Sequence, residues 1–295
     1  MPSMELPVVV GVDGSAASLR AVDWASDEAA LRGVPLRLVY ASLWERYEGP
    51  ALAEVLGKPS EQVRADTIVD SAAIRAGRRN PDLKVSPEVL RADAVSALVR
   101  EARNASMVVV ASRGRSGVAE LLLGSVSLAV AARASCPVIV LRDGLGQRAR
   151  TRAEQRIVLG VGDEPDSVAV PFAFQEAADR HAALHAVRAW RCPAHDSADP
   201  PLSAAEAARD HEQRATDLLN RALRDAAAEH PSVRVRPRIV EGVARTALVE
   251  ASHTADLLVV GARRHRGHLG LQLGRVTHAV LHHSACPVAV VPQRT

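Results

Sequence analysis

A loop of small and basic residues after the apolar run Met107–Val110 has the composition of a phosphate-binding site. It leads into a helical pattern that begins at Gly124, Ser125 and Val126. The first main-chain N–H groups of a helix have no partner within the helix, and the helix dipole adds partial positive charge there. The stretch therefore predicts a seat for an anion such as a phosphate group.

Three residue types in this loop suit a phosphate ligand. Gly114 and Gly124 have no Cβ, so the backbone can approach the ligand closely, and the Ser125 hydroxyl can donate a hydrogen bond to a phosphate oxygen. Arg113 either supplies positive charge to the ligand or is a solvated surface residue. The sequence leaves these two alternatives open.

A second group of residues, Gly11, Val12 and Asp13, ends another apolar run. Ligands of open parallel sheets bind at the carboxyl ends of the strands, where the strand order reverses. Asp13 and the loop after Val110 are therefore expected to share one site, in which the carboxylate accepts hydrogen bonds from a ribose or an amino group. The alternative is that Asp13 only stabilises a helix N-terminus. The nearby loop favours the ligand contact.

The elements that position these residues alternate between apolar runs and helical patterns. Strands are expected at Val8–Val12, Leu36–Ala41, Val85–Leu90, Val108–Val110 and Val138–Leu141, with helices at Ala16–Arg32, Glu61–Gly77, Ala94–Ala102 and from Gly124 through Arg133. On the second helix, Val63, Ile68, Ala72 and Ile74 are expected to form the apolar stripe. This alternation predicts an α/β fold with a parallel sheet covered by helices on both faces.

The chain also repeats itself. Residues 8–42 match 157–190, and residues 108–141 match 258–291. A tandem duplication follows, with one domain at 1–145, a polar linker around residues 143–155, and a second domain at 154–295. A period this long excludes a solenoid of short repeats.

The second repeat departs from the first at the predicted site. Gly261 and Gly274 are present, but Arg264 and Arg275 replace a glycine and a serine, and Gly162 stands in place of the acidic residue. The two arginines either fill the phosphate seat or bind a different anion. We favour the first alternative, because a long side chain obstructs the place where backbone must touch phosphate.

Composition excludes several classes of protein. The net charge of +3 over 295 residues is too small to indicate nucleic-acid binding by itself. No apolar run approaches the roughly 20 residues that span a bilayer, and the N-terminus has no signal-peptide pattern. Three cysteines offer neither a disulfide framework nor a metal-ligand spacing, so a cytoplasmic protein is expected. Cys136 and Cys286 are expected to be buried small hydrophobic residues.

Catalytic motifs are missing from the sequence. All eleven histidines lie in the second repeat, where those around His265 and His268 are expected to form a basic surface loop rather than a zinc site. Ser125 therefore has no histidine in its own repeat to act as a base. The GxxxxGK[ST] loop of ATPases is also missing. We expect no robust enzymatic activity.

The residues of the first repeat resemble the universal stress protein family. Its nucleotide-binding members carry Gly-x-x-Gly, nine residues, and then Gly followed by Ser or Thr. Here Ala111 replaces the first glycine, Gly114 is the second, and Gly124 and Ser125 close the pattern. Ala111 weakens the match, because alanine tolerates positive φ less well than glycine. The resemblance covers nearly the whole chain as two tandem domains and implies a five-stranded sheet in each.

The resemblance further implies that the first domain binds ATP or a related adenine nucleotide, with or without Mg²⁺. It places the triphosphate on the glycine loop, the adenosine against Asp13, and the adenine beside the backbone of Ala41. The resulting candidate binding residues are Gly11, Val12, Asp13, Ala41, Ala111, Arg113, Gly114, Gly124, Ser125 and Val126.

Three functions are then open. The first is a nucleotide-dependent stress-response module without robust catalysis, and the second is a weak nucleotide hydrolase of the same superfold. The third is a ligand-free interaction scaffold, in which the apolar strands Val138–Leu141 and Val288–Val291 pair between domains or subunits. The resemblance implies dimer-like packing of the two domains or a homo-oligomer.

Overall fold

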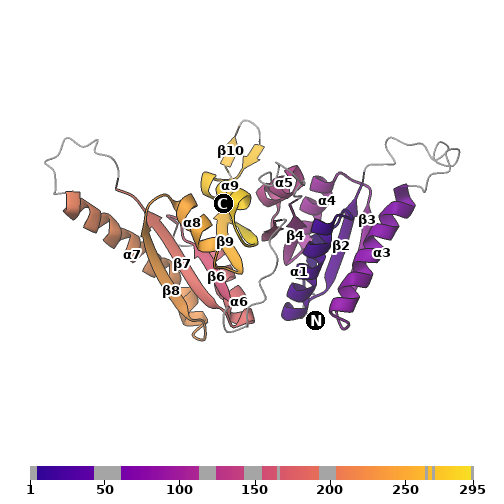
Figure 1. Cartoon of the computed structure of the whole chain (residues 1–295), viewed down its shortest axis with the longest axis horizontal. Coiled ribbons are helices and arrows are strands. Elements are labelled where there is room, and N and C mark those ends of the chain that lie inside the picture. The colour runs from indigo at the N-terminus through magenta and orange to yellow at the C-terminus, as the bar shows by residue number, and fades with distance from the viewer. Residues whose placement is uncertain are drawn as a thin grey trace. The chain divides into compact units, whose positions relative to one another are not determined.

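The structure is a computed structural model, and it describes the protein in two compact units, Met1–Gly144 and Leu145–Thr295. The described residues are 5–42, 61–112, 124–142, 155–164, 167–192, 204–262, 265–267 and 270–293. Each unit contains a five-stranded parallel sheet with helices on both faces (Figure 1). The predicted α/β fold is confirmed.

The sheet of unit 1 has the strand order β3-β2-β1-β4-β5. The strands are β1 (Val8–Gly11), β2 (Leu36–Ala41), β3 (Val85–Leu90), β4 (Met107–Ala111) and β5 (Val138–Leu141). The central strands are runs of valine and similar residues with almost no exposed surface, as expected where helices cover both faces. The chain moves outward from β1 in one direction and then in the other, so the order reverses between β1 and β4.

The helices of unit 1 form two layers. They are α1 (Ala16–Arg32), α3 (Glu61–Arg79), α4 (Ala94–Glu101), the short 3-10 helix η2 (Ala102–Asn104) and α5 (Ser125–Arg133). Helix α1 packs against α3 on one face, and α4 packs against α5 on the other. Gly33 ends α1 in the left-handed conformation, with φ of 68°.

The apolar stripe predicted on α3 is wrong at Val63 and Ile74 and correct at Ala72, and Ile68 is half-buried. Val63 and Ile74 are 54% and 57% exposed, whereas the buried face consists of Ala65, Val69, Ala72 and Ala76. These four residues recur at helical spacing. The mostly small side chains on this face let α3 lie close to the sheet and to α1, and Val63 and Ile74 are left at solvent.

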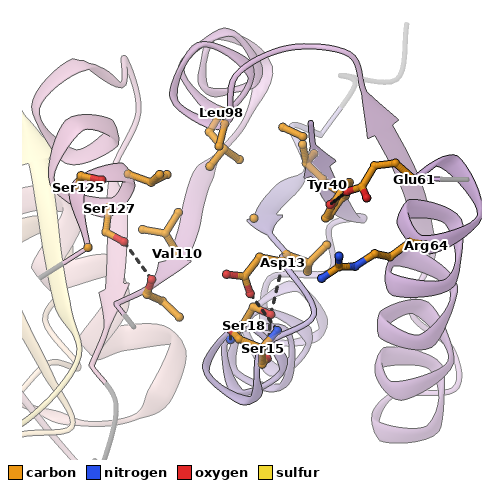
Figure 2. Close-up of a pocket in the computed structure, with 18 residues that line it drawn as sticks. Asp13, Ser15, Ser18, Tyr40, Glu61, Arg64, Leu98, Val110, Ser125 and Ser127 are labelled. Atoms are coloured by element: carbon orange, nitrogen blue, oxygen red, sulfur yellow. Dashed lines mark hydrogen bonds between the residues drawn. The ribbon is translucent and has the colours of Figure 1, made fainter. Parts of the chain in front are cut away.

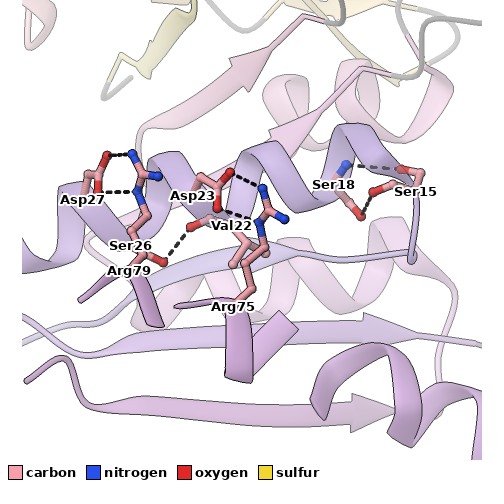
Figure 3. A network of polar contacts seen from close by, with 8 residues as sticks. All are labelled: Ser15, Ser18, Val22, Asp23, Ser26, Asp27, Arg75 and Arg79. Carbon is pink, nitrogen blue, oxygen red and sulfur yellow. Dashed lines mark hydrogen bonds and ion pairs between the residues drawn. The ribbon is translucent and has the colours of Figure 1, made fainter. Parts of the chain in front are cut away.

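Two bidentate ion pairs join α3 to α1 (Figure 3). The Arg75 guanidinium donates to both carboxylate oxygens of Asp23 at 2.6 Å, and Arg79 donates to those of Asp27 at 2.6 and 2.7 Å. The hydrogen bonds that each arginine donates to its aspartate raise the pKa of that arginine. Because both pairs repeat after four residues on both helices, they fix the register between α1 and α3.

We expect a measurable coupling energy between Asp23 and Arg75. Exposed ion pairs contribute about 0.2–1 kcal/mol, and bidentate geometry favours the upper end of that range. A double-mutant cycle of Asp23→Ala and Arg75→Ala, followed by urea denaturation, measures it. Asp210 and Arg214, which are 3.8 Å apart and largely exposed, form the control pair and should show almost no coupling. Equal coupling energies in the two cycles would contradict the role of the Asp23–Arg75 pair in fixing the register between α1 and α3.

Unit 2 repeats the architecture with the order β8-β7-β6-β9-β12. Its strands are β6 (Arg156–Gly160), β7 (Ala183–Trp190), β8 (Val235–Glu241), β9 (Leu257–Ala262) and β12 (Val288–Pro292). Helices α6 (Ala169–Arg180) and α7 (Ala204–Glu229) pack together on one face, and α8 (Ala244–Ser252) and α9 (Arg275–His283) on the other.

One segment of unit 2 differs from the expectation. Where a basic loop was expected, β10 (His265–Gly267) pairs antiparallel with β11 (Gly270–Gln272). The two strands are joined by two residues, and a glycine stands on each side of that connection, which is typical of a tight hairpin. Cys136 and Cys286 are buried, as predicted.

His185 on β7 gives unit 2 a pH-dependent stability. Its Nε2 atom is buried and has no hydrogen-bond partner among the described residues. Burial lowers the pKa of His185, and so do the charges of three arginines on the neighbouring strands: Arg156, Arg236 and Arg238. The folded protein therefore favours the neutral imidazole.

Acidification is expected to destabilise the wild-type protein partly through His185. The folded pKa lies below the unfolded value of about 6.5. The stability from this group is therefore present above that unfolded value and is lost as the pH falls through the folded pKa. His185→Gln should lose less unfolding free energy between about pH 7.5 and pH 5, as measured by urea denaturation. An equal acid-induced loss in variant and wild type would contradict this account.

Candidate functional site

A cavity of about 470 Å³ lies at the carboxyl ends of β1, β2 and β4 in unit 1 (Figure 2). This is the place where the strand order reverses, which is where open parallel sheets bind ligands. Eight of the ten predicted binding residues line it: Gly11, Val12, Asp13, Ala41, Ala111, Gly124, Ser125 and Val126. The other two, Arg113 and Gly114, lie outside the described residues.

The end of β1 forms the middle of the cavity wall. The Val12 N–H donates to the Val39 carbonyl at 2.9 Å, which fixes the strand end against β2. A Cβ added at Gly11 would lie 3.0 Å from Leu98 Cδ1 and 3.7 Å from Val110 Cγ1. Glycine at this position therefore keeps space between the strand and α4.

Asp13 is held in place by the turn that follows β1. Its Oδ1 accepts a hydrogen bond from the Ser15 N–H at 2.9 Å, and Gly14 takes a φ of +79°. Ser15 in turn caps α1 by accepting from the Ser18 N–H at 3.2 Å. Asp13 thus serves the start of α1 and lines the cavity at the same time, so the two alternatives considered for it are compatible.

The start of α5 forms the end of the cavity at which the sequence predicts phosphate binding. Gly124 is the N-cap residue, and it contributes no side-chain hydrogen bond to the helix. The first N–H groups of this nine-residue helix therefore have no cap from that residue, next to Ser125 and Val126 in the cavity wall. The Ser127 hydroxyl donates to the Ala111 carbonyl at 2.9 Å and holds α5 against β4. This end is suited to an anion.

The expected disadvantage of Ala111 is wrong. Ala111 is the last residue of β4 and pairs with Leu141 of β5. Among the described residues, His181 is the only one other than glycine with a positive φ. Ala111 therefore has an ordinary strand backbone, on which a Cβ causes no strain.

Sequence reasoning missed the far end of the cavity, which is lined by Tyr40, Glu61 and Arg64. The Tyr40 hydroxyl donates to Glu61 Oε1 at 3.2 Å. Burial raises the pKa of Tyr40, as do the charge and hydrogen bond of Glu61, while the charge of Arg64 acts in the opposite direction. The one local signal for Tyr40 is its place next to Ala41, and no local pattern links Glu61 or Arg64 to the strand ends.

The cavity has the size and lining of a small-molecule site. Its volume lies within the range of about 300–1,000 Å³ that is common for ligand pockets.

Among the described residues, no group of three or more His, Cys, Asp or Glu side chains is arranged to hold a metal ion. In the part of the chain that the structure describes, no helix has both the length and the apolar composition needed to cross a membrane.

The corresponding place in unit 2 contains an arginine. Pairing of β6 with β7 puts Arg188 at the position that Tyr40 has in unit 1. The Arg188 guanidinium donates to the Gly162 carbonyl, to the Val161 carbonyl at 3.5 Å, and to Asp163 Oδ1 at 2.9 Å. A side chain of the protein thus binds the backbone at the end of β6.

The end of β9 in unit 2 is covered as well. The Gln293 carboxamide hydrogen-bonds to the Ser167 hydroxyl and accepts from the Val168 N–H at 3.3 Å. A Cβ added at Gly261 would overlap Gln293 Nε2, so the Gln293 side chain lies directly over this strand end. Of the two arginines expected to fill the phosphate seat, Arg275 begins α9 and is exposed, and Arg264 lies outside the described residues.

Comparison with known proteins gives consistent matches. The sequence model of the universal stress protein family matches residues 5–142 and again residues 154–292. Universal stress protein Rv1996 of Mycobacterium tuberculosis is 32% identical over 310 residues, which cover 98% of this chain and 96% of that protein.

Solved structures match too. The crystal structure of a universal stress protein from Archaeoglobus fulgidus has a TM-score of 0.66 at 18% identity and covers 98% of this chain and 96% of its own. A universal stress protein from the same organism, solved in complex with dAMP, has a TM-score of 0.38 at 24% identity and covers 47% of this chain and 99% of its own.

Proposed function

Since this chain belongs to the universal stress protein family, we propose that it binds ATP in the cavity of unit 1 and acts as a nucleotide-dependent stress-response module without robust catalysis. The observation that carries the proposal is the meeting of two features in one cavity. The start of α5 offers N–H groups to phosphates, and the Asp13 carboxylate lies on the wall between that end and the end formed by α3.

The cavity supports one orientation of the nucleotide. Phosphates would bind at Gly124, Ser125 and Val126, and the ribose hydroxyls would donate to Asp13. The adenine would then lie beside Ala41, near the first turn of α3. A Mg²⁺ ion would be carried mainly on the nucleotide phosphates, which is common for this ion.

The proposal assigns one nucleotide to each chain. In unit 2, Gly162 replaces the acidic residue, the Arg188 guanidinium donates to the Gly162 carbonyl, and the Gln293 side chain lies against Gly261 at the end of β9. We therefore propose that unit 2 does not bind ATP. Location in the cytoplasm, expected from the sequence, is a separate part of the proposal. Pairing of the last strands between units or subunits stays a prediction.

Mass analysis of small molecules released from freshly purified, denatured protein tests this proposal, together with titration of stripped protein with ATP. We expect a nucleotide-to-chain ratio approaching one and a single binding site in the titration. Two sites per chain would show that unit 2 also binds. No release and no binding after addition of ATP would overturn the proposal and favour a ligand-free scaffold.

A further inference from the structure

We infer that Glu61, positioned by Tyr40, makes the cavity of unit 1 selective for a purine with an amino group at its 6-position over one with a keto group there. The inference rests on the proposed nucleotide site and concerns how that site reads the base. Glu61 is the first residue of α3, and Tyr40 is the penultimate residue of β2. Both line the same cavity as Ala41.

The arrangement of the cavity brings these side chains to its base end. Figure 2 shows Ser125 on one side, Glu61 and Arg64 on the other, and Asp13 between them. A nucleotide with its phosphates at the start of α5 and its ribose at Asp13 therefore extends its base toward α3. The residue that meets the outer edge of that base is then contributed by α3.

The chemistry of the carboxylate gives the selectivity. An ionised carboxylate only accepts hydrogen bonds, and it has about four acceptor positions on its two oxygens. Glu61 Oε1 accepts from the Tyr40 hydroxyl at 3.2 Å, and further positions, including those on Oε2, can face the ligand. An amino group donates to such an oxygen, whereas a keto oxygen placed there repels it and leaves both acceptors without a donor.

Tyr40 acts on selectivity through Glu61. Its hydroxyl holds one carboxylate oxygen and so restricts the rotation of the Glu61 side chain. The Arg64 guanidinium lines the same end of the cavity and balances the negative charge of Glu61 beside a negatively charged ligand. Tyr40 is thus a positioning residue, and Glu61 is the residue that would contact the base.

The test compares ATP with inosine 5′-triphosphate, which differ at the purine 6-position in having an amino or a keto group. Dissociation constants are measured by calorimetry on stripped full-length protein. We expect wild type to bind ATP at least about tenfold more tightly, the size expected when a hydrogen-bond acceptor loses its donor. Glu61→Gln should bring the ratio close to one, because the carboxamide can rotate to donate to the keto oxygen.

Two further variants make the result specific. Asp66→Asn removes an equal charge from the exposed side of α3, where Asp66 accepts from Gln62 at 2.9 Å, and it should keep the wild-type ratio. Tyr40→Phe should lower the ratio partly, with little change in affinity for inosine triphosphate. This pattern separates positioning from a general structural defect, since a defect would weaken both ligands equally.

The outcomes distinguish the two proposals. A wild-type ratio that is kept in both Glu61→Gln and Tyr40→Phe would overturn the role of Glu61 and leave nucleotide binding intact. Equal affinity of the wild type for ATP and inosine triphosphate would also overturn the role of Glu61 and leave nucleotide binding intact. If wild type binds neither ligand, the proposed function itself fails and the base selectivity fails with it.

Discussion

Replacing Asp13 with alanine is expected to weaken ATP binding at least about tenfold. The variant removes a carboxylate from the middle of the cavity, where ribose hydroxyls would donate to it. Hydrogen bonds to a charged group contribute about 1.5–3 kcal/mol, and a factor of ten corresponds to about 1.4 kcal/mol. Calorimetric titration of the full chain measures the change.

Two variants separate loss of the ligand contact from damage to the turn after β1. Asp13→Asn keeps an oxygen that can accept from the Ser15 N–H, so the turn should persist while the charge is lost. Asp163→Ala removes an aspartate from unit 2, where its side chain is 84% exposed, and should leave ATP affinity unchanged. Wild-type affinity in both Asp13 variants would show that the nucleotide does not contact this residue.

Replacing Phe174 with alanine is expected to destabilise unit 2 by about 3–5 kcal/mol, the cost of truncating a fully buried aromatic side chain. Phe174 on α6 has no exposed surface, and its ring stacks on His230 with 6.0 Å between the ring centroids. Scanning calorimetry should show unit 2 unfolding at a lower temperature, while ATP binding in unit 1 persists below that transition.

Phe172→Ala is the matched control for this experiment. Phe172 lies on the same helix but is only partly buried, so the same truncation should cost clearly less. If Phe174→Ala abolished ATP binding at a temperature where the protein is still folded, the two units would not be independent. A single cooperative transition that shifts as a whole would contradict the prediction as well.

The sequence predicted most of the fold because parallel strands covered on both faces are continuous apolar runs. The predicted strands at Leu36–Ala41 and Val138–Leu141 and the helix at Ala16–Arg32 have the bounds found in the structure. The site residues that directly follow or end strands were predictable for a related reason. In a parallel sheet, the carboxyl ends of the strands meet at one edge, so local signals far apart in the sequence converge.

The residues contributed by α3 could not be found in this way. Glu61 and Arg64 come twenty residues or more after β2, and only tertiary packing brings them to Tyr40. The buried face of α3 was misjudged for a different reason. Large apolar residues such as Val63 carry the strongest hydrophobic signal, but close packing against the sheet selects alanine, which carries little.

The second site shows a similar difference between pattern and packing. The sequence predicted obstruction by Arg264 and Arg275, because these residues interrupt the glycine pattern. In the structure, the side chain that binds the backbone at this place is that of Arg188, which lies on a strand and belongs to no motif. Its importance appears only when the register of β6 and β7 makes it equivalent to Tyr40.

Because the Arg188 guanidinium binds the end of β6 in unit 2, the stabilities of the two units depend differently on nucleotide concentration. A ligand that binds only the folded state stabilises it by an amount that grows with ligand concentration, about 2.7 kcal/mol at one hundred times Kd. With ATP as that ligand, the stability of unit 1 follows the cellular nucleotide supply. Arg188 is part of the chain and cannot be diluted, so unit 2 stays equally stable when nucleotide is scarce. Nucleotide depletion would then lower the stability of unit 1 while the stability of unit 2 stays the same.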